Sequence, residues 1–346
     1  MNIHIANPLS DSRWDELVAR HPRASAFHRR GWLESLARTY GYEPLVLTSS
    51  PAGEPLQDGI VLCRVASWIT GTRLVSLPFA DHCDPLLQDA DESREFSNWL
   101  QAECDRKRWD YVELRPLSWN QPADGVLKAS GSYCFHTLDL TPTLEQLFRN
   151  LHRDSIQRRI QRAEKERLTC EAGRSPELVS EFYRLVRMTR RRHQLVPQPR
   201  SWFRNLVECM GEDLQIRVAR KDGFGVAAML TLRHRSRVIY KYGCSDERFH
   251  NLAGVPFLFW RLIEESKTSG IEEIDFGRSD LENQGLIRFK DRFGTRKTLL
   301  TYFRYSPTSK GAIASSWGSQ AVRQILSVLP EVVSPAAGRI LYRHIG

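Results

Sequence analysis

Apolar and polar residues alternate at Val238–Tyr242 in the manner of a half-buried β-strand. A second short strand is predicted at Ile271–Phe276. Between the two, apolar residues recur at helical spacing; Pro256 suits the first turn of a helix and Gly270 stops it. The pattern therefore predicts one amphipathic helix between two strands.

Similar patterns elsewhere predict an α/β fold class with two mixed α/β domains in tandem, over residues 1–142 and 143–305. In the first domain we expect strands at Leu45–Leu47, Gly59–Val65, Leu74–Leu77 and Tyr111–Leu114, and helices near Trp14–His21, Gly31–Tyr40 and Glu92–Lys107. In the second we expect further strands at Leu214–Arg220, Gly225–Arg233 and Thr298–Tyr305, and helices at Thr143–Arg167, Ser175–Arg191, Pro199–Met210 and Pro256–Ser269. No repeat is obvious by sequence identity, although both halves follow one plan.

The segment 306–346 differs from both domains and predicts an amphipathic helical tail. Apolar residues fall on one helical face at Ile313, Trp317, Ala321, Val322, Ile325, Leu326 and Leu329. Such a helix could lie on an anionic membrane surface through residues 312–345, or it could pack on the second domain. The pattern leaves both interpretations open.

Length and composition fit a soluble globular protein. The 346 residues suffice for two domains, and 41% are hydrophobic and 26% charged. No apolar run approaches the ~20 residues that cross a bilayer, and the start lacks a secretory pattern, so we expect a cytoplasmic protein, at most peripheral at the inner face of the cell membrane. The seven scattered cysteines contain no C-x-x-C pair, which favours reduced thiols over disulfides or a zinc site.

The formal charge of +9 is concentrated in two arginine-rich segments, Phe148–Arg167 and Thr189–Gln194. Arginine suits bidentate contact with phosphate, so we predict phosphate-binding roles for Arg159 and Arg191. The candidate partners are transfer RNA, the diphosphate of coenzyme A or of a lipid-linked substrate, and an anionic membrane. A solvated helix face is the alternative for any single arginine. Nothing resembles a DNA-binding motif, which argues against gene regulation.

The turn at Arg248–Gly254, which leads into the central helix, resembles the Arg/Gln-x-x-Gly-x-Gly/Ala loop of the GNAT acyltransferase fold. In that family, backbone N–H groups at a helix N-terminus hold the pyrophosphate of coenzyme A. The resemblance implies donor-phosphate binding by Arg248, Asn251, Ala253 and Gly254. Asn251 stands where glycine is usual, and its side chain would narrow the approach of a phosphate.

Four further segments resemble the FemAB-like proteins, which carry two GNAT-type domains and include aminoacyl-tRNA-dependent transferases. These segments are Phe27–Leu33, Tyr240–Asp246, Asp275–Asp280 and Phe289–Gly294. The Phe-Lys-x-x-Phe-Gly pattern of the last segment is the most specific. The resemblance spans most of the chain and implies acyl or aminoacyl transfer. No coiled-coil arm of the kind found in some cross-bridge enzymes is evident.

The family fold implies a cleft where the two central parallel strands splay apart. By this resemblance Lys290 would stabilise an oxyanion or a donor phosphate, although it could equally be a surface lysine paired with a carboxylate. Asp275 would orient a cation or accept the amine proton, with strand-end capping as the alternative. Other residues near the strand ends are assigned to catalysis, donor phosphate and acceptor, respectively: Tyr242; Arg278; Tyr240 and Asp280.

In the first domain, a loop after a predicted strand contains Asp81, His82, Cys83 and Asp84. Such loops at strand ends often carry sites in α/β folds. We assign His82 as a candidate general base and Asp81 and Asp84 as candidate acceptor-binding residues. A thiol nucleophile and a metal site are less favoured, because adjacent residues rarely face each other and no second histidine has ligand spacing.

These features predict an N-acyltransferase that moves an acyl or aminoacyl group to an amine of a cell-envelope or lipid precursor. The expected co-substrate is aminoacyl-tRNA, acyl-coenzyme A or an acyl carrier protein, with no permanently bound cofactor. Fatty N-acylation of an amino-lipid of the sphingolipid type, from acyl-coenzyme A, is the alternative activity. A non-catalytic member that binds an anionic polymer during exopolysaccharide or cell-wall assembly is the alternative from another class.

Overall fold

The computed structural model describes residues 2–68, 71–119, 125–307 and 342–344. The chain forms two compact units, Met1–Ser132 with Leu300–Gly346, and Tyr133–Leu299. Both are mixed α/β, which confirms the expected fold class. The predicted tail helix lies outside the described residues, except that the short segment 342–344 packs in the first unit. There the Tyr42 hydroxyl donates to the Tyr342 carbonyl and Arg73 Nη2 donates to the His344 carbonyl at 2.9 Å.

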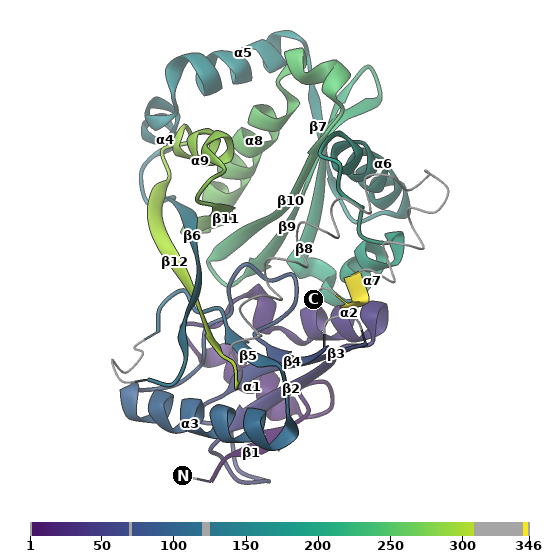
Figure 1. The fold of residues 1–346 in the computed structure, drawn as a ribbon. Helices are drawn as coiled ribbons and strands as arrows, with labels where there is room; N and C mark the ends of the chain where they lie inside the picture. The colour runs from purple at the N-terminus through teal and green to yellow at the C-terminus, as the bar shows by residue number, and fades with distance from the viewer. Residues whose placement is uncertain (1, 69–70, 120–124, 308–341, 345–346) are drawn as a thin grey trace. The chain divides into compact units, whose positions relative to one another are not determined.

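Each unit holds six strands, and the two orders mirror each other (Figure 1). The first unit has the order β1 (His4–Ala6), β2 (Glu43–Thr48), β3 (Ile60–Ser67), β4 (Gly71–Val75), β5 (Tyr111–Leu114) and β12 (Arg296–Tyr305). The second has β7 (Thr169–Gly173), β8 (Leu214–Lys221), β9 (Phe224–His234), β10 (Arg237–Ser245), β11 (Glu273–Asp280) and β6 (Lys128–Asp139). In each unit one pair is parallel, β4 with β5 and β10 with β11.

The helices repeat the same plan. In the first unit they are α1 (Ser12–Arg20), the 3₁₀ turn η1 (Ala26–His28), α2 (Arg30–Tyr40) and α3 (Ala90–Lys107). In the second they are α4 (Leu144–Asn150), the π-turn η2 (Arg153–Gln157), α5 (Arg158–Lys165), α6 (Pro176–Arg192), α7 (Arg200–Met210), the 3₁₀ turns η3 (Gly211–Asp213) and η4 (Glu247–Leu252), α8 (Gly254–Thr268) and α9 (Gln284–Asp291). Helix α3 connects β4 with β5 as α8 connects β10 with β11, so the two units are structural repeats.

The sixth strand of each unit comes from the other half of the sequence. Strand β6 follows β5 in the chain but pairs with β11, whereas β12 follows β11 and pairs with β5. Because of this exchange, the observed division at Ser132 and Leu299 differs from the boundaries at 142 and 305 expected from the sequence. The predicted elements did not include β6, whose first half is exposed and rich in small polar residues.

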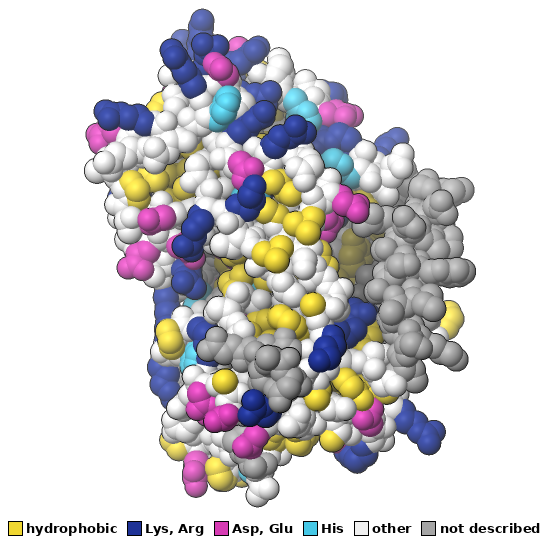
Figure 2. Space-filling model, turned by 60° about the vertical axis from the view of Figure 1, so that its left-hand side comes forward, with side chains coloured by type: hydrophobic (Ala, Val, Ile, Leu, Met, Phe, Trp, Pro, Cys, Tyr) yellow, Lys and Arg dark blue, Asp and Glu magenta, His cyan; other side chains and the backbone are white. Residues whose placement is uncertain are grey.

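The expected single basic helix at Thr143–Arg167 is wrong in its continuity. Helix α4 ends at Asn150 because Leu151 adopts an extended backbone, and the His152 N–H donates to the Arg292 carbonyl at 2.8 Å. A π-turn then leads into α5, whose buried face carries Ile160 and Ala163. Arginines cover its solvent side, and Figure 2 shows Lys and Arg side chains gathered on this part of the second unit.

The core of the second unit is built around aromatic rings of α8. The Phe259 ring is fully buried and stacks on Phe276 of β11, with ring centroids 4.8 Å apart. Phe293 lies 4.8 Å and Phe289 5.9 Å from the same ring. The two phenylalanines of the Phe-Lys-x-x-Phe-Gly pattern therefore fix α9 against α8.

Replacement of Phe259 by alanine should remove the centre of this ring cluster. We expect a loss of about 3–5 kcal/mol in the free energy of unfolding, because the cavity cannot collapse between two packed elements. The matched control is Phe224→Ala, at a 73% exposed ring, which should change stability by less than about 0.5 kcal/mol. Urea unfolding of both variants measures this, and equal effects would contradict the assigned core.

Candidate anion-binding site at the start of helix α8

A cavity of about 570 Å³ lies where α8 begins. Its walls come from α5, α6, the ends of β9 and β10, the loop before α8, and α9. The polar lining residues are Arg159, Arg192, Ser245, His250 and Asn251, and Phe289 contributes an apolar wall. The two arginine-rich segments of the sequence thus meet at one place in the fold.

The backbone at the start of α8 approaches β9 closely. Asp246 caps the turn η4, Ala253 takes a left-handed conformation with φ of +60°, and Gly254 begins α8. A Cβ atom on Gly254 would lie 3.0 Å from the Cβ of Ala227, so glycine is required at this contact. The first N–H groups of a helix have no intrahelical acceptor and face outwards at its positive end. Here that end lines the cavity.

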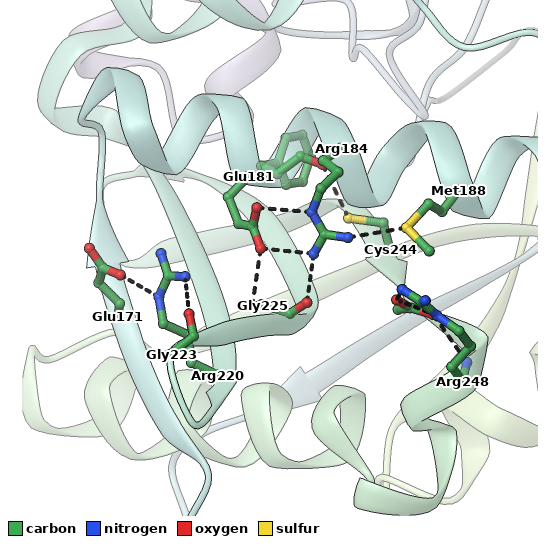
Figure 3. Close-up of polar contacts among 11 residues, drawn as sticks. Glu171, Glu181, Arg184, Met188, Arg220, Gly223, Gly225, Cys244 and Arg248 are labelled. Carbon is green, nitrogen blue, oxygen red and sulfur yellow. Dashed lines mark hydrogen bonds and ion pairs between the residues drawn. The ribbon is translucent and has the colours of Figure 1, made fainter. Parts of the chain in front are cut away.

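Helix α6 is tied to the strands in a way that brings its basic end to the cavity (Figure 3). Glu181 accepts a hydrogen bond from the Gly225 N–H at 3.1 Å, and Arg184 donates to the Gly225 carbonyl at 2.7 Å. Glu181 and Arg184 also pair with each other at 2.8 Å. One turn further on, Thr189 Oγ1 donates to the Ser245 carbonyl at 3.1 Å and accepts from the Ser245 N–H at 2.9 Å.

Two cavity arginines carry uncompensated charge. Arg192 Nη1 donates to His250 Nε2 at 3.1 Å, and its guanidinium has no carboxylate within ion-pair distance among the described residues. Arg159 likewise has neither an ion pair nor a hydrogen bond within the described part of the chain. Most arginines near them are paired, as Arg158 is with Asp154 at 3.0 Å. Unpaired guanidinium groups beside a helix N-terminus favour an anion.

His250 stands between these charges. Ser245 Oγ lies 3.0 Å from the same Nε2 atom that accepts from Arg192. Partial desolvation, and then the positive charge of Arg192, lower the pKa of His250 below its usual value. The imidazole is therefore neutral near pH 7, with Nε2 as an acceptor.

The residues of the glycine-type loop separate in the structure. Asn251, Ala253 and Gly254 line the cavity, whereas Arg248 does not. The Arg248 side chain is 70% exposed and pairs with Asp246, Nη2 lying 2.6 Å from Oδ2. Of the two predicted phosphate-binding arginines in the basic segments, Arg159 lines the cavity, and Arg192 stands there in place of its neighbour Arg191.

The predicted site residues of β11 and α9 lie at an interruption of the strand. The pairing of β11 with β6 shifts between Asp275 and Arg278, and Gly277 has φ of +72°. Asp275 Oδ1 accepts from the Gly277 N–H at 2.6 Å. Lys290 is only 3% exposed, and its Nζ donates to the carbonyls of Gly277 at 2.9 Å and Arg278 at 3.0 Å. Lys290 thus satisfies carbonyl groups that the bulge takes out of the ladder.

Strands β10 and β11 pair over only three residues, the last being Ile239 with Asp275. Beyond that point β10 continues beside β9 to Ser245, and β11 continues beside β6 to Asp280. The sheet therefore opens between the two strands, as the tandem fold implied. Tyr240 packs into this region, its ring centroid 4.6 Å from that of Phe259.

The remaining predicted residues near the opening have separate surroundings. The Tyr242 hydroxyl accepts from Trp202 Nε1 at 2.9 Å. The Arg278 guanidinium lies over the Tyr133 ring, 4.0 Å from its centroid, and Asp280 is exposed at the end of β11. None of these residues lines the cavity at α8.

The first unit lacks a matching opening because a loop occupies it. After β4, the Ser76 N–H donates to the Glu113 carbonyl at 2.8 Å, and the Cys83 N–H donates to the Arg115 carbonyl at 2.7 Å. The chain at 76–85 thus pairs with β5 and its extension at the place where β10 and β11 diverge in the second unit.

This loop holds its chemically able residues in structural contacts. The His82 ring is 3% exposed and packs edge-on against Phe27 at 5.2 Å. Asp84 Oδ1 accepts from the Leu117 N–H at 2.6 Å and from the Ser118 N–H at 3.0 Å. The Asp81 carbonyl accepts from the Tyr302 hydroxyl at 2.6 Å.

The second unit has the architecture of a GNAT acyltransferase domain. Residues 150–291 match the family model described as an acetyltransferase (GNAT) domain, which confirms the predicted class of acyltransferase. No curated protein matches the sequence.

Solved structures extend the likeness to both units. The crystal structure of FemX matches with a TM-score of 0.68 at 14% identity, over 94% of this chain and 100% of that chain. L-PGS from Bacillus licheniformis matches with a TM-score of 0.60 at 14% identity, over 93% and 98%. A tandem GNAT protein from the clavulanic acid biosynthesis pathway matches with a TM-score of 0.51 at 11% identity, over 89% and 100%. The FemAB-like resemblance is thus confirmed in the fold. Among the described residues, no helix has the length and apolar character of a membrane span.

Lys290→Ala should destabilise the second unit, because two buried carbonyls lose their donor. An unsatisfied buried polar group costs about 1–3 kcal/mol in the free energy of unfolding. Lys297→Ala, at a lysine whose side chain is 53% exposed, is the matched control and should stay within about 0.5 kcal/mol of the parent protein. Urea unfolding measures both. Unchanged stability of Lys290→Ala would mean that the bulge does not need this ammonium group.

Proposed function

We propose that this protein transfers an acyl or aminoacyl group to an amine, and that the cavity at α8 binds a phosphate of the activated donor. The observation that carries the proposal is the pair of uncompensated guanidinium groups, Arg159 and Arg192, beside the N-terminus of a 15-residue helix. Guanidinium groups and unpaired backbone N–H groups are the donors that phosphate binds in proteins. The GNAT domain assignment supplies the reaction class.

The donor is aminoacyl-tRNA, acyl-coenzyme A or an acyl carrier protein, all of which carry phosphate next to the activated acyl group. The exposed arginines of α5, among them Arg153, Arg158 and Arg162, continue the positive surface beyond the cavity and suit a polyanion. Asn251 lines the cavity, which leaves less room for a pyrophosphate than a glycine would. These two features favour the RNA-borne donor.

The amine attacks the acyl carbonyl, and three things are then required: a place for the amine proton, a donor for the oxyanion, and an in-line arrangement of the two substrates. We place this chemistry at the opening between β10 and β11. Asp275 at that opening is the proposed proton acceptor, and the bulge that Lys290 supports fixes its position. The acceptor is proposed to be an amine of a cell-envelope or lipid precursor. The likeness to FemX and to L-PGS supports that class.

Transfer assays separate the donors. Purified protein is incubated with mixed aminoacyl-tRNA or with a panel of acyl-coenzyme A esters, and release of the acyl group to an amine-containing lipid or envelope extract is measured. We expect transfer from aminoacyl-tRNA that falls steeply as salt rises, because each phosphate contact releases counterions. Transfer from neither donor would contradict the proposed function.

Arg159→Ala and Arg192→Ala should each weaken donor binding. A hydrogen bond to a charged group contributes about 1.5–3 kcal/mol, so each change should raise the donor Kd about ten- to hundredfold. Fluorescence anisotropy with labelled tRNA measures this. Arg158→Ala is the matched control, because its side chain is 65% exposed, pairs with Asp154 and does not line the cavity. Equal weakening by Arg158→Ala would show general charge attraction in place of a site.

A further inference from the structure

We infer that His250 is a positioning residue that holds Arg192 for the donor phosphate and takes up a proton when that phosphate binds. The inference rests on the proposed function of the cavity. It names a residue that acts through its neighbour and a proton that accompanies binding.

The contacts of His250 define two exclusive states. Nε2 has one lone pair and accepts from Arg192 Nη1 at 3.1 Å, because a guanidinium can only donate. Once Nε2 carries a proton, it becomes a donor, and two donors 3.1 Å apart repel each other. Protonated His250 can instead donate to the Ser245 hydroxyl, 3.0 Å away, or to a phosphate oxygen. Arg192 is then released towards the cavity.

A bound phosphate completes the exchange. In the unliganded state His250 keeps the Arg192 guanidinium at the rim and prevents it from turning to solvent. A phosphate oxygen in the cavity offers Arg192 a charged acceptor in place of the imidazole, and the negative charge favours the protonated ring. Binding therefore adds one cation, His250, to the two that Arg159 and Arg192 already provide.

The charges that face His250 act in both directions. Arg192 of α6 and Arg159 of α5 oppose its protonation, whereas Glu247 and Asp246 on its own turn favour it. Desolvation is the largest influence, and the net effect lowers the pKa in the free protein. An anion in the cavity raises the pKa again. Affinity for the anion therefore increases as pH falls through the pKa of the complex, and it levels off below the pKa of the free protein.

The test uses ligands whose phosphates do not themselves titrate near neutrality. Dephospho-coenzyme A and a short RNA ending in CCA, without terminal phosphates, contain only phosphodiester-type charges. Their Kd for the full-length protein is measured by calorimetry from about pH 5.5 to 7.5, the range in which a histidine titrates. For the ligand that binds, we expect Kd to fall about three- to tenfold as pH decreases, with proton uptake that shows as a dependence of the heat on the buffer.

Three variants separate positioning from charge. In His250→Gln the amide oxygen can still accept from Arg192, so Kd at pH 7.5 should stay within about threefold of the parent value while the pH dependence disappears. In His250→Ala the acceptor is also lost, and binding should weaken throughout. His193→Gln removes a neighbouring histidine that does not line the cavity, and should keep the parent pH dependence.

The outcomes distinguish this inference from the proposed function. A Kd that does not change with pH, or a pH dependence that survives in His250→Gln, overturns the role of His250 and leaves the phosphate site standing. Binding of neither ligand at any pH overturns both. Loss of the pH dependence in His193→Gln would assign the proton to the end of α6 and also overturn the role of His250.

Discussion

The brevity of the parallel pairing between β10 and β11 is the constraint on which the second unit depends. Three residue pairs join the strands, and each strand then follows its antiparallel neighbour. A parallel pair that parts in this way leaves main-chain groups to be satisfied by other means. The Gly277 bulge, the Asp275 contact and the buried ammonium group of Lys290 are local solutions to that problem. Helix α8 begins beside the opening and aims its positive end at the cavity.

The two repeats resolve the same geometry differently. In the first unit, the loop at 76–85 pairs with β5 and its extension and buries His82 and Asp84. In the second, the corresponding turn is short, tightly packed at Gly254 and open to a cavity with unpaired arginines. The duplicated plan thus has one half specialised for packing and the other left with unbalanced positive charge. Such charge is costly without a counter-ion, which is why its presence points to a ligand.

Much of the fold follows from local pattern. The periodicity at Val238–Tyr242 and Ile271–Phe276 predicted both central strands, and the family resemblance predicted two repeats. The sequence did not show that β6 and β12 exchange partners, because pairing between distant strands leaves little local signal. It also did not show that Lys290 is buried. A lysine is usually exposed, and only the bulge in β11 makes a buried ammonium group favourable. Arg192 and His250 were missed as a pair for a similar reason: α6 and the turn before α8 are separated by most of the sheet in sequence. A histidine inside the glycine-type loop was the one signal that could have identified the site.

The exchange of sixth strands has a consequence for how the chain matures on the ribosome. Strand β5 is complete once residue 114 has emerged, but its antiparallel neighbour, at Phe303–Tyr305, is made last. Throughout synthesis of the second half, the outer edge of β5 has unsatisfied peptide groups, and an exposed edge readily pairs with foreign strands. Vectorial, half-by-half folding is therefore impossible for the first unit. Its sheet closes only after translation has passed both repeats.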